Sequence, residues 1–329
     1  MSFKSLPNAV PPLPFFSIVM PVYKTEQFLY QAIESVIEQT YINFELIVIN
    51  NNSSNPDGIT PLNVIKKFND NRIIYKYCAN QGVSYARNLG LDVSTGQYIL
   101  LLDSDDYYSN ISFLSDLMNE ISSFSNNVDS AVQNHTDLNI STETRTSDID
   151  IYYIDQLTPF ITKDDSSIDI LEDESKKGRS TNPNFIKELV HISIPEGSFV
   201  IDSKYIKEGH RFNNNMITAE GFSLLNSIQS RYNYKQIYKQ YHRLNSKGIM
   251  YRQHPSSTTS NLNWQQTEKQ ALQSLYTDLI KDNNLPFHPK IIARLSRFRL
   301  NFDYNKNFYE FICFKAIIWV QKILTNWKF

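Results

Sequence analysis

The sequence predicts an α/β fold: a mostly parallel sheet with flanking helices, followed by a helical C-terminal extension. Two observations predict the sheet. Short hydrophobic runs alternate with segments of helical periodicity, and each run ends in a polar cluster. Strands that are hydrophobic throughout and joined by helices are typical of parallel sheets covered on both faces. The chain has 329 residues, of which 41% are hydrophobic, enough for a sizeable core.

The first hundred residues supply these elements in order. Phe16 to Met20 reads as a buried strand that stops at Pro21, and Thr25 reads as the cap of the next helix. That helix has one hydrophobic face, made of Phe28, Leu29, Ala32, Ile33, Val36 and Ile37. Further strands are expected over 44–49, 73–77 and 98–102, with a helix over 83–93 and a turn at Gly96. Ligands of such sheets bind beyond the carboxyl ends of the strands.

The rest of the chain is less regular. Residues 124–185 are rich in Ser, Thr, Asn and Asp, so we expect a variable insert of loops broken by strands near 128–132 and 149–154. After this insert we expect an ordered stretch over 192–201. A helix from about Glu220, a strand over 248–254 and a helix over 264–280 are expected to follow. The expected domains are a tail (1–14), a first half (15–107), a second half (108–260) and a helical extension (261–329).

Charge and cysteine content narrow the class of protein. The 32 Lys and Arg nearly cancel the 34 Asp and Glu, so no overall field favours nucleic acid, and no nucleic-acid partner is expected. Two cysteines, Cys78 and Cys313, cannot form a disulfide framework. The N-terminal residues lack the hydrophobic region of a secretion signal, and no run is long enough to span a membrane. These features predict a cytoplasmic protein.

An acidic cluster, Asp103-Ser104-Asp105-Asp106, follows the hydrophobic run 99–102. Crowded carboxylates repel one another and need a compensating cation to stay ionised. Oxygen ligands of this kind suit Mg²⁺ or Mn²⁺, which share their coordination with substrate phosphates. The alternative is an acidic surface turn, because Asp and Ser favour turns.

Three further motifs precede this cluster in the chain: SIVMPVY at 17–23, FELIVIN at 44–50 and NQGVSYARNLG at 80–90. Together with the acidic cluster they closely resemble the nucleotide-binding half of the family 2 inverting glycosyltransferases, which have the Rossmann-like GT-A fold. The resemblance is continuous over 15–107 and returns weakly at 197–225 and 251–257.

The resemblance implies that an Asp-x-Asp pair, Asp103 and Asp105, holds a divalent metal, Mn²⁺ or Mg²⁺, against the diphosphate of a nucleotide-sugar. The metal offsets charge on the departing nucleoside diphosphate. Arg87 is expected to meet the nucleotide, with an ordinary surface arginine as the alternative. The nucleotide-sugar-binding residues that the resemblance implies are Pro21, Val22, Tyr23, Asn50, Asn51, Ser53, Arg87, Asp103 and Ser104.

The sequence departs from the family first at Asn50 to Asn55. The family has Asp-Asp-Gly-Ser-Thr-Asp or a near variant there, and this chain has Asn-Asn-Asn-Ser-Ser-Asn. An amide carbonyl can still accept a hydrogen bond from a pyrimidine N–H. Uracil is therefore expected, and thymine or another base stays open.

The second departure lies in the acceptor half. The family has Glu-Asp there, with the aspartate as general base, and this chain has Glu220-Gly221. We expect Glu220 to serve as the base, with an ordinary first-turn helix residue as the alternative. Tyr251-Arg-Gln-His254 resembles the family's Tyr-Arg-x-His, which implies a metal or phosphate contact for His254 and a diphosphate contact for Arg252.

The C-terminal tail is basic and amphipathic. Residues 286–329 hold eight Lys and Arg against two acidic residues. A helix over 308–327 would gather Ile312, Ala316, Trp319, Ile323 and Trp327 on one face. Such a helix suits peripheral contact with an anionic membrane, and packing against the catalytic domain or a second copy of the chain explains the pattern equally well.

The sequence therefore predicts a metal-dependent inverting glycosyltransferase that moves a sugar, a hexose or N-acetylhexosamine, from a UDP-sugar to a saccharide or lipid-linked saccharide in surface glycan synthesis. The main alternative is a nucleotide-sugar-binding protein with little or no catalysis, because Gly221 replaces the expected aspartate. A dehydrogenase is disfavoured, since no Gly-x-Gly-x-x-Gly follows the first strand. A nucleotidyltransferase is disfavoured because 21–24 is not a Gly-rich phosphate loop.

Overall fold

The computed structural model describes most of the first 133 residues and several later segments. The described residues are 15–52, 60–133, 151–154, 157–162, 168–170, 199–216, 220–230, 241–255, 257, 264–281, 290–291, 294–295 and 297. The expected N-terminal tail, Ser53 and the expected amphipathic helix over 308–327 lie outside them.

The central sheet is mixed and mostly parallel. Among the described residues its strand order is β10-β6-β9-β4-β1-β2-β3. β1 pairs in parallel with β2 and β4, and β2 with β3, whereas β9 runs antiparallel to β4 and β6. The strands are β1 (Phe16–Val22), β2 (Phe44–Asn50), β3 (Ile73–Tyr77), β4 (Tyr98–Leu101), β6 (Ile151–Ile154), β9 (Phe199–Asp202) and β10 (Tyr241–Leu244). The predicted fold class is confirmed.

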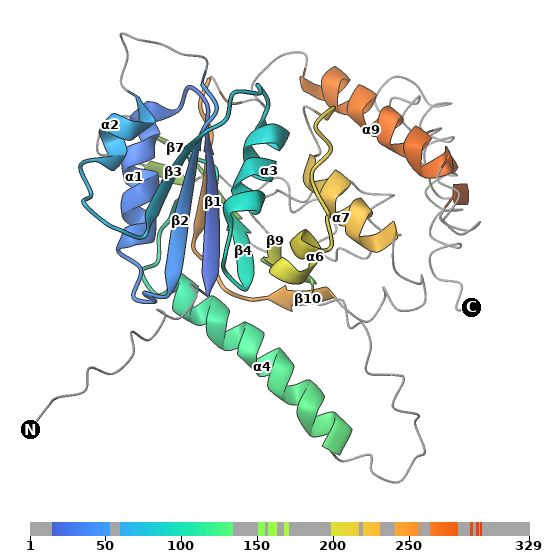
Figure 1. The fold of residues 1–329 in the computed structure, drawn as a ribbon, viewed down its shortest axis with the longest axis horizontal. Helices are drawn as coiled ribbons and strands as arrows, with labels where there is room; N and C mark the ends of the chain where they lie inside the picture. The colour runs from blue at the N-terminus through green and yellow to red at the C-terminus, as the bar shows by residue number, and fades with distance from the viewer. Residues whose placement is uncertain are drawn as a thin grey trace, which may run out of the picture.

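Helices cover both faces of this sheet (Figure 1). On one face, Leu29 and Ile33 of α1 pack with the inward side chains of β1 and β2. On the other face, Ala86 of α3 lies in a core shared with Leu224 of α7 and Leu272 of α9. The described helices are α1 (Glu26–Ile37), α2 (Pro61–Ile65), α3 (Val83–Val93), α4 (Phe113–Gln133), α6 (Ser203–Lys207), α7 (Glu220–Ser230) and α9 (Trp264–Lys281).

A second, smaller sheet joins the end of the first half to later parts of the chain. Its order is β5-β11-β7-β8, with β5 (Tyr107–Tyr108), β7 (Leu157–Thr162), β8 (Ile168–Ile170) and β11 (Ile249–Arg252). β5 directly follows the acidic cluster, and β11 pairs with it antiparallel. This pairing brings the Tyr-Arg-x-His segment beside the acidic cluster.

One local expectation was wrong, and another is confirmed in position only. No strand forms near 128–132: α4 continues through these residues to Gln133. Phe113, Leu114, Leu117 and Ile121 recur at helical spacing and are buried, so packing of the first half of α4 outweighs the polar composition of the second. Thr25 stands at the N-cap of α1 but makes no capping hydrogen bond with its side chain.

The other expected elements agree with the structure where it describes them. They are β6, α7, β11 and α9, together with the four strands and two helices of the first hundred residues. Of the expected ordered stretch 192–201, residues 199–201 lie in β9, and 192–198 lie outside the described residues.

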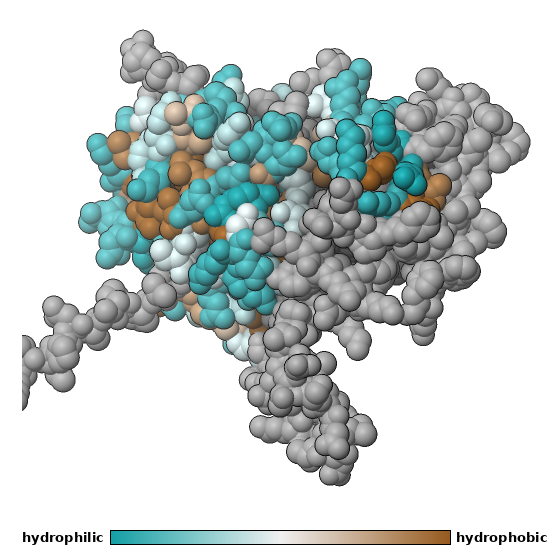
Figure 2. All heavy atoms as spheres, turned by 45° about the vertical axis from the view of Figure 1, so that its right-hand side comes forward, coloured by the Kyte–Doolittle hydropathy of each residue, from teal (hydrophilic) through white to brown (hydrophobic). Residues whose placement is uncertain are grey.

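The surface of the described part is a mosaic of hydrophilic and hydrophobic residues. On the face shown in Figure 2, a larger area of hydrophobic residues lies on the left and a smaller one on the right, each among hydrophilic residues. Within the described residues, no helix combines the length and the hydrophobicity that crossing a membrane requires.

Close packing of α3 on β1 fixes the helix that carries Arg87. A Cβ atom built on Gly90 would lie 2.2 Å from Cγ1 of Val19, and Val19 is fully buried in the sheet. A β-branched side chain in a strand has little rotamer freedom with which to move aside. Glycine at position 90 therefore lets α3 approach the sheet closely.

We predict that Gly90→Ala lowers the free energy of unfolding by about 1–3 kcal/mol, because the added methyl group overpacks the core. Urea denaturation measures the change. In the Val19→Ala background the same substitution should cost less, because the clashing methyl groups are gone. Equal costs in the two backgrounds would contradict the packing explanation.

Candidate functional site

Polar residues follow β1, β2 and β4 at one edge of the sheet. Val22 of β1 and Asn50 of β2 are register partners, and Leu102 donates its backbone N–H to the carbonyl of Val19 at 3.1 Å. The residues after these strands are therefore neighbours in space. This is the edge at which ligands of open α/β sheets bind.

The acidic turn, defined here as Asp103 to Asp106, concentrates negative charge at this edge. The backbone N–H of Asp106 donates to the carbonyl of Asp103 at 3.0 Å and closes the turn. Burial, and then the charge of Asp103, raise the pKa of Asp105, while His254 opposes the shift. Asp106 is 7% exposed, and burial together with the other two aspartates raises its pKa well above the ordinary value.

Arg87 bridges this turn and the second half of the chain. Its Nη2 lies 2.9 Å from Oδ1 of Asp103, and its Nη1 lies 2.6 Å from Oε1 of Glu220. Arg87 is 2% exposed and Glu220 is 7% exposed. The alternative of an ordinary surface arginine is therefore wrong. Buried charges need partners, and here one guanidinium serves two carboxylates.

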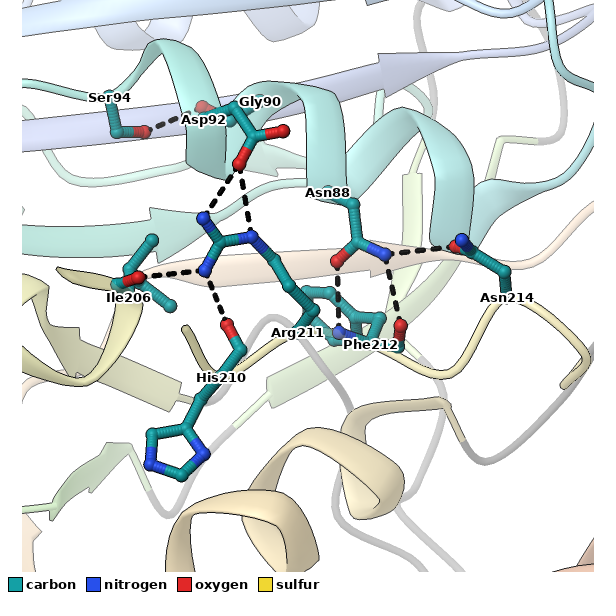
Figure 3. A network of polar contacts seen from close by, with 9 residues as sticks. All are labelled: Asn88, Gly90, Asp92, Ser94, Ile206, His210, Arg211, Phe212 and Asn214. Carbon is teal, nitrogen blue, oxygen red and sulfur yellow. Dashed lines mark hydrogen bonds and ion pairs between the residues drawn. The ribbon is translucent and has the colours of Figure 1, made fainter. Parts of the chain in front are cut away.

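Hydrogen bonds join α3 to the segment before α7, as Figure 3 shows. The Asn88 side chain accepts from the backbone N–H of Phe212 at 2.9 Å and donates to the Phe212 carbonyl at 2.9 Å. Arg211 donates to Asp92 at 2.7 and 3.0 Å and to the carbonyl of Ile206 at 2.8 Å. This segment is thus fixed on the helix that carries Arg87, and Glu220 follows as the first residue of α7.

Arg252 and His254 approach the acidic turn from β11. The backbone N–H of Arg252 donates to Oδ1 of Asp106 at 2.9 Å, and its Nε donates to the carbonyl of Asp105 at 2.8 Å. Nε2 of His254 lies 2.9 Å from Oδ2 of Asp105. Burial lowers the pKa of Arg252, while Tyr107, Asp106 and Asp105 raise it. The segment therefore supplies positive and hydrogen-bonding groups to the carboxylates.

The asparagine cluster, Asn50 to Asn52, forms a network of amide hydrogen bonds. Oδ1 of Asn51 accepts from the backbone N–H of Gly82 at 3.0 Å, and Nδ2 donates to the carbonyls of Asn80 at 2.6 Å and Cys78 at 3.3 Å. Asn51 is 2% exposed, so it ties β2 to the loop before α3.

Asn50 uses its amide in a similar way. Its Oδ1 accepts from the backbone N–H of Asn52 at 3.0 Å, and its Nδ2 donates to the hydroxyl of Tyr75 at 3.0 Å. The backbone donor fixes which amide atom is the oxygen. A base contact by Asn50 or Asn51 stays a prediction, and these bonds give both side chains a structural role.

The remaining expected donor-site residues differ in exposure. Pro21 and Val22 are buried in β1, whereas Tyr23 is 50% exposed beside the ammonium of Lys24. Ser104 is buried, and its hydroxyl lies 2.6 Å from that of Thr25. Only Tyr23 among these four presents a large free surface at the edge.

The structure also tests how the residues suit a divalent metal. In the described part of the chain, no three His, Cys, Asp or Glu side chains come together as a metal centre. His254 bonds to Asp105, and Asp103 pairs with Arg87. Asp103 and Asp105 are both half-buried, and Mg²⁺ and similar ions are commonly held by one or two carboxylates together with water and substrate phosphates. The donor set fits such a cation and does not form an all-protein cage.

Three residues of α1 and its cap reach the site, although none of them was expected there from the sequence. Thr25 contacts Ser104, Phe28 contacts Arg252 and His254, and Gln31 contacts Arg252. Their spacing of three residues places them along one side of the helix. Phe28 had been expected only as part of a hydrophobic face.

Sequence comparisons find a matching family and several relatives. The family model described as "Glycosyl transferase family 2" matches residues 17–196. Glycosyltransferase GlyA of Streptococcus pneumoniae is 39% identical over 93 residues, which cover 28% of this chain and 13% of GlyA. The minor teichoic acid biosynthesis protein GgaB of Bacillus subtilis is 42% identical over 100 residues, which cover 30% of this chain and 11% of GgaB. The match therefore spans only a small part of each of these relatives.

Solved structures share the fold across nearly the whole chain. Staphylococcus aureus TarS 1–349 in complex with UDP-GlcNAc gives a TM-score of 0.58 at 14% identity, covering 94% of this chain and 81% of that one. The mannosyltransferase PcManGT from Pyrobaculum calidifontis, in complex with GDP-Man and Mn²⁺, gives 0.55 at 11% identity, covering 96% and 77%. At such identities the likeness shows the fold alone.

We predict that Asn51→Asp destabilises the protein by about 1–3 kcal/mol or more, because a buried carboxylate would face the carbonyls of Asn80 and Cys78 instead of donating to them. Asn50→Asp is the matched control. Its Oδ1 already accepts, and the Tyr75 hydroxyl can donate to the new oxygen, so we expect a change under about 1 kcal/mol. Urea denaturation measures both, and equal effects would contradict the network.

Proposed function

This chain belongs to glycosyl transferase family 2, and from that premise we propose that it transfers a sugar from a UDP-sugar to a hydroxyl group of a saccharide or lipid-linked saccharide. The observation that carries the proposal is the shared ion pair of Arg87. It joins the acidic turn, at the ligand-binding edge of the sheet, to Glu220 in the other half of the chain. A transferase needs such an arrangement, because the donor and the acceptor must meet at one place.

The acidic turn is the proposed site of the diphosphate. Asp105 and Asp103 would hold a divalent cation, Mn²⁺ or Mg²⁺, which when bound neutralises charge on the leaving nucleoside diphosphate. PcManGT was solved with GDP-Man and Mn²⁺, which supports the same type of cofactor here. His254 orients the Asp105 carboxylate through its 2.9 Å contact.

Glu220 is the proposed general base. Arg87 holds Oε1, so we assign proton transfer to the other oxygen, Oε2. The acceptor hydroxyl transfers its proton to Oε2, and the hydroxyl oxygen forms a bond to the anomeric carbon of the sugar. The bond between that carbon and the diphosphate oxygen breaks at the same time. A single displacement of this kind inverts the configuration and needs no nucleophile from the protein. Arg87 also pairs with the buried carboxylate of Glu220.

The donor and the setting are proposed from relatives. TarS was solved with UDP-GlcNAc, and GgaB is named for teichoic acid biosynthesis. We infer a UDP-hexose or UDP-N-acetylhexosamine donor and a role in surface glycan synthesis. A cytoplasmic location, peripheral membrane contact through 308–327 and self-association belong to the same proposal.

A second candidate function is nucleotide-sugar binding with little catalysis. Gly221 supplies no carboxylate, and Glu220 is both buried and engaged by Arg87. Tight binding of UDP together with no transfer to any hydroxyl, water included, would favour this candidate.

We predict that Asp105→Asn lowers Mn²⁺-dependent turnover of the best UDP-sugar at least about a hundredfold, because the variant keeps the shape of the side chain and loses its charge. Donor hydrolysis or transfer, followed by UDP release, measures the rate. Asp278→Asn, at an exposed position on α9, is the matched control and should leave the rate unchanged. Turnover that survives both Asp105→Asn and EDTA would refute the metal role.

We predict that Glu220→Gln lowers turnover by about 10²–10⁴-fold while leaving UDP affinity within a few-fold, because the amide can still accept from Arg87 but cannot take a proton. Isothermal titration measures affinity, and initial rates measure turnover. Full turnover in this variant would refute Glu220 as the base. A gain on adding Gly221→Asp to Glu220→Gln would show that position 221 can carry the role.

A further inference from the structure

The helix α1 contacts the acidic turn and β11 along one side. The Thr25 hydroxyl lies 2.6 Å from that of Ser104 within the turn. Gln31, two helical turns further on, accepts from Nη2 of Arg252 through its Oε1. Phe28 lies between Thr25 and Gln31 in the chain. Three positions on one helix thus reach two segments that are about 150 residues apart in the chain.

The Phe28 ring is shared by two side chains of the β11 segment. The guanidinium carbon of Arg252 lies 4.5 Å from the ring centroid, and the ring centroids of Phe28 and His254 are 4.9 Å apart. Cations and imidazoles are attracted to aromatic faces at such distances. Phe28 is half-buried, so its ring is not simply part of the hydrophobic core beneath α1.

Gln31 and Phe28 together restrict the Arg252 guanidinium. Gln31 holds one end, the Asp105 carbonyl holds Nε at 2.8 Å, and the Phe28 ring lies against its face. The planar fork of an arginine has defined donor directions, so these contacts define its orientation. His254 is only two residues further along the chain, and its Nε2 meets Asp105 at 2.9 Å.

We propose that Phe28 and Gln31 are positioning residues that hold His254 against Asp105 and so set the geometry of the proposed diphosphate site. Gln31 acts through Arg252, and Phe28 acts through Arg252 and through its own contact with the His254 ring. Neither residue touches the substrate in this proposal. It rests on the proposed function for its effect on donor binding, whereas the placement of His254 can be measured without any substrate.

The decisive experiment compares two identical substitutions on one helix. Gln31→Leu removes the acceptor for Arg252, and Gln27→Leu makes the same change at an exposed position. Two conservative variants keep the contacts: Gln31→Glu retains an acceptor, and Phe28→Tyr retains the ring, whereas Phe28→Leu removes it. Thermal denaturation identifies any variant that fails to fold.

The first readout is the histidine ring ¹H–¹⁵N spectrum of the metal-free full chain, with the His254 signals assigned by their loss in His254→Asn. We expect these signals to move in Gln31→Leu and Phe28→Leu, and to stay in place in Gln27→Leu, Gln31→Glu and Phe28→Tyr. The Gln31 variants decide, because loss of the Phe28 ring current alone moves the signals of the adjacent His254 ring. A merely structural role of Gln31 would lower stability without moving them. His254 signals that are the same in Gln31→Leu as in the wild type would overturn the proposal.

The second readout is titration of UDP in the presence of Mn²⁺. We expect Gln31→Leu and Phe28→Leu to weaken binding about tenfold, the usual effect of losing one contact to a charged group, and the other three variants to bind within about twofold of the wild type. Failure of the wild type to bind UDP would refute the proposed function, and the His254 signals would still decide the positioning role. UDP binding that is unchanged in both Leu variants at positions 28 and 31 would overturn the proposed control of the diphosphate site.

Discussion

Crowding of negative charge on the acidic turn is the constraint on which the arrangement of the site depends. Asp103, Asp105 and Asp106 lie within four residues, and the last of these is buried. Burial and mutual repulsion raise the pKa values of Asp105 and Asp106, so ionisation costs more in the fold than in the unfolded chain. These two groups therefore reduce the stability of the metal-free fold as the pH rises from the unfolded-state pKa, about 4, through their raised values, and their unfavourable contribution persists above them.

Positive and hydrogen-bonding groups from two distant parts of the chain offset this negative charge. Arg87 on α3 meets Asp103, while Arg252 at the end of β11 meets Asp106 and His254, two residues later, meets Asp105. Arg87 lies on α3, and Arg252 lies on β11, which pairs with β5 in the smaller sheet. In the proposed function, a diphosphate bound through a divalent cation would relieve the remaining repulsion.

The shared ion pair of Arg87 connects the acidic turn to α7, because Arg87 contacts both Asp103 and Glu220. One buried guanidinium bonds to both carboxylates, so Asp103 and Glu220 are held together. Gly221, which follows Glu220, adds no carboxylate of its own. Arg87 is therefore the charged group that holds Glu220, and residue 221 offers no second carboxylate.

The sequence predicted the parallel sheet and its ligand edge because those features follow from local patterns: hydrophobic strands, helical periodicity and polar strand ends. It did not predict the partners of Arg87, since Glu220 lies 133 positions away and such pairing depends on tertiary packing. The continuation of α4 was missed because the Ser and Asn residues of its second half carry no helical signal. The bonds of the asparagine cluster and the contacts of Phe28 and Gln31 also join distant segments, so no local pattern could indicate them.

The most direct test of the account is a crystal structure of the full chain with UDP and Mn²⁺, with anomalous data collected at the manganese edge. The account predicts one strong anomalous peak bonded to the carboxylate of Asp105 and to the diphosphate of UDP, with Arg87 still joining Asp103 and Glu220. A manganese peak away from the acidic turn, or UDP bound at another edge of the sheet, would contradict it.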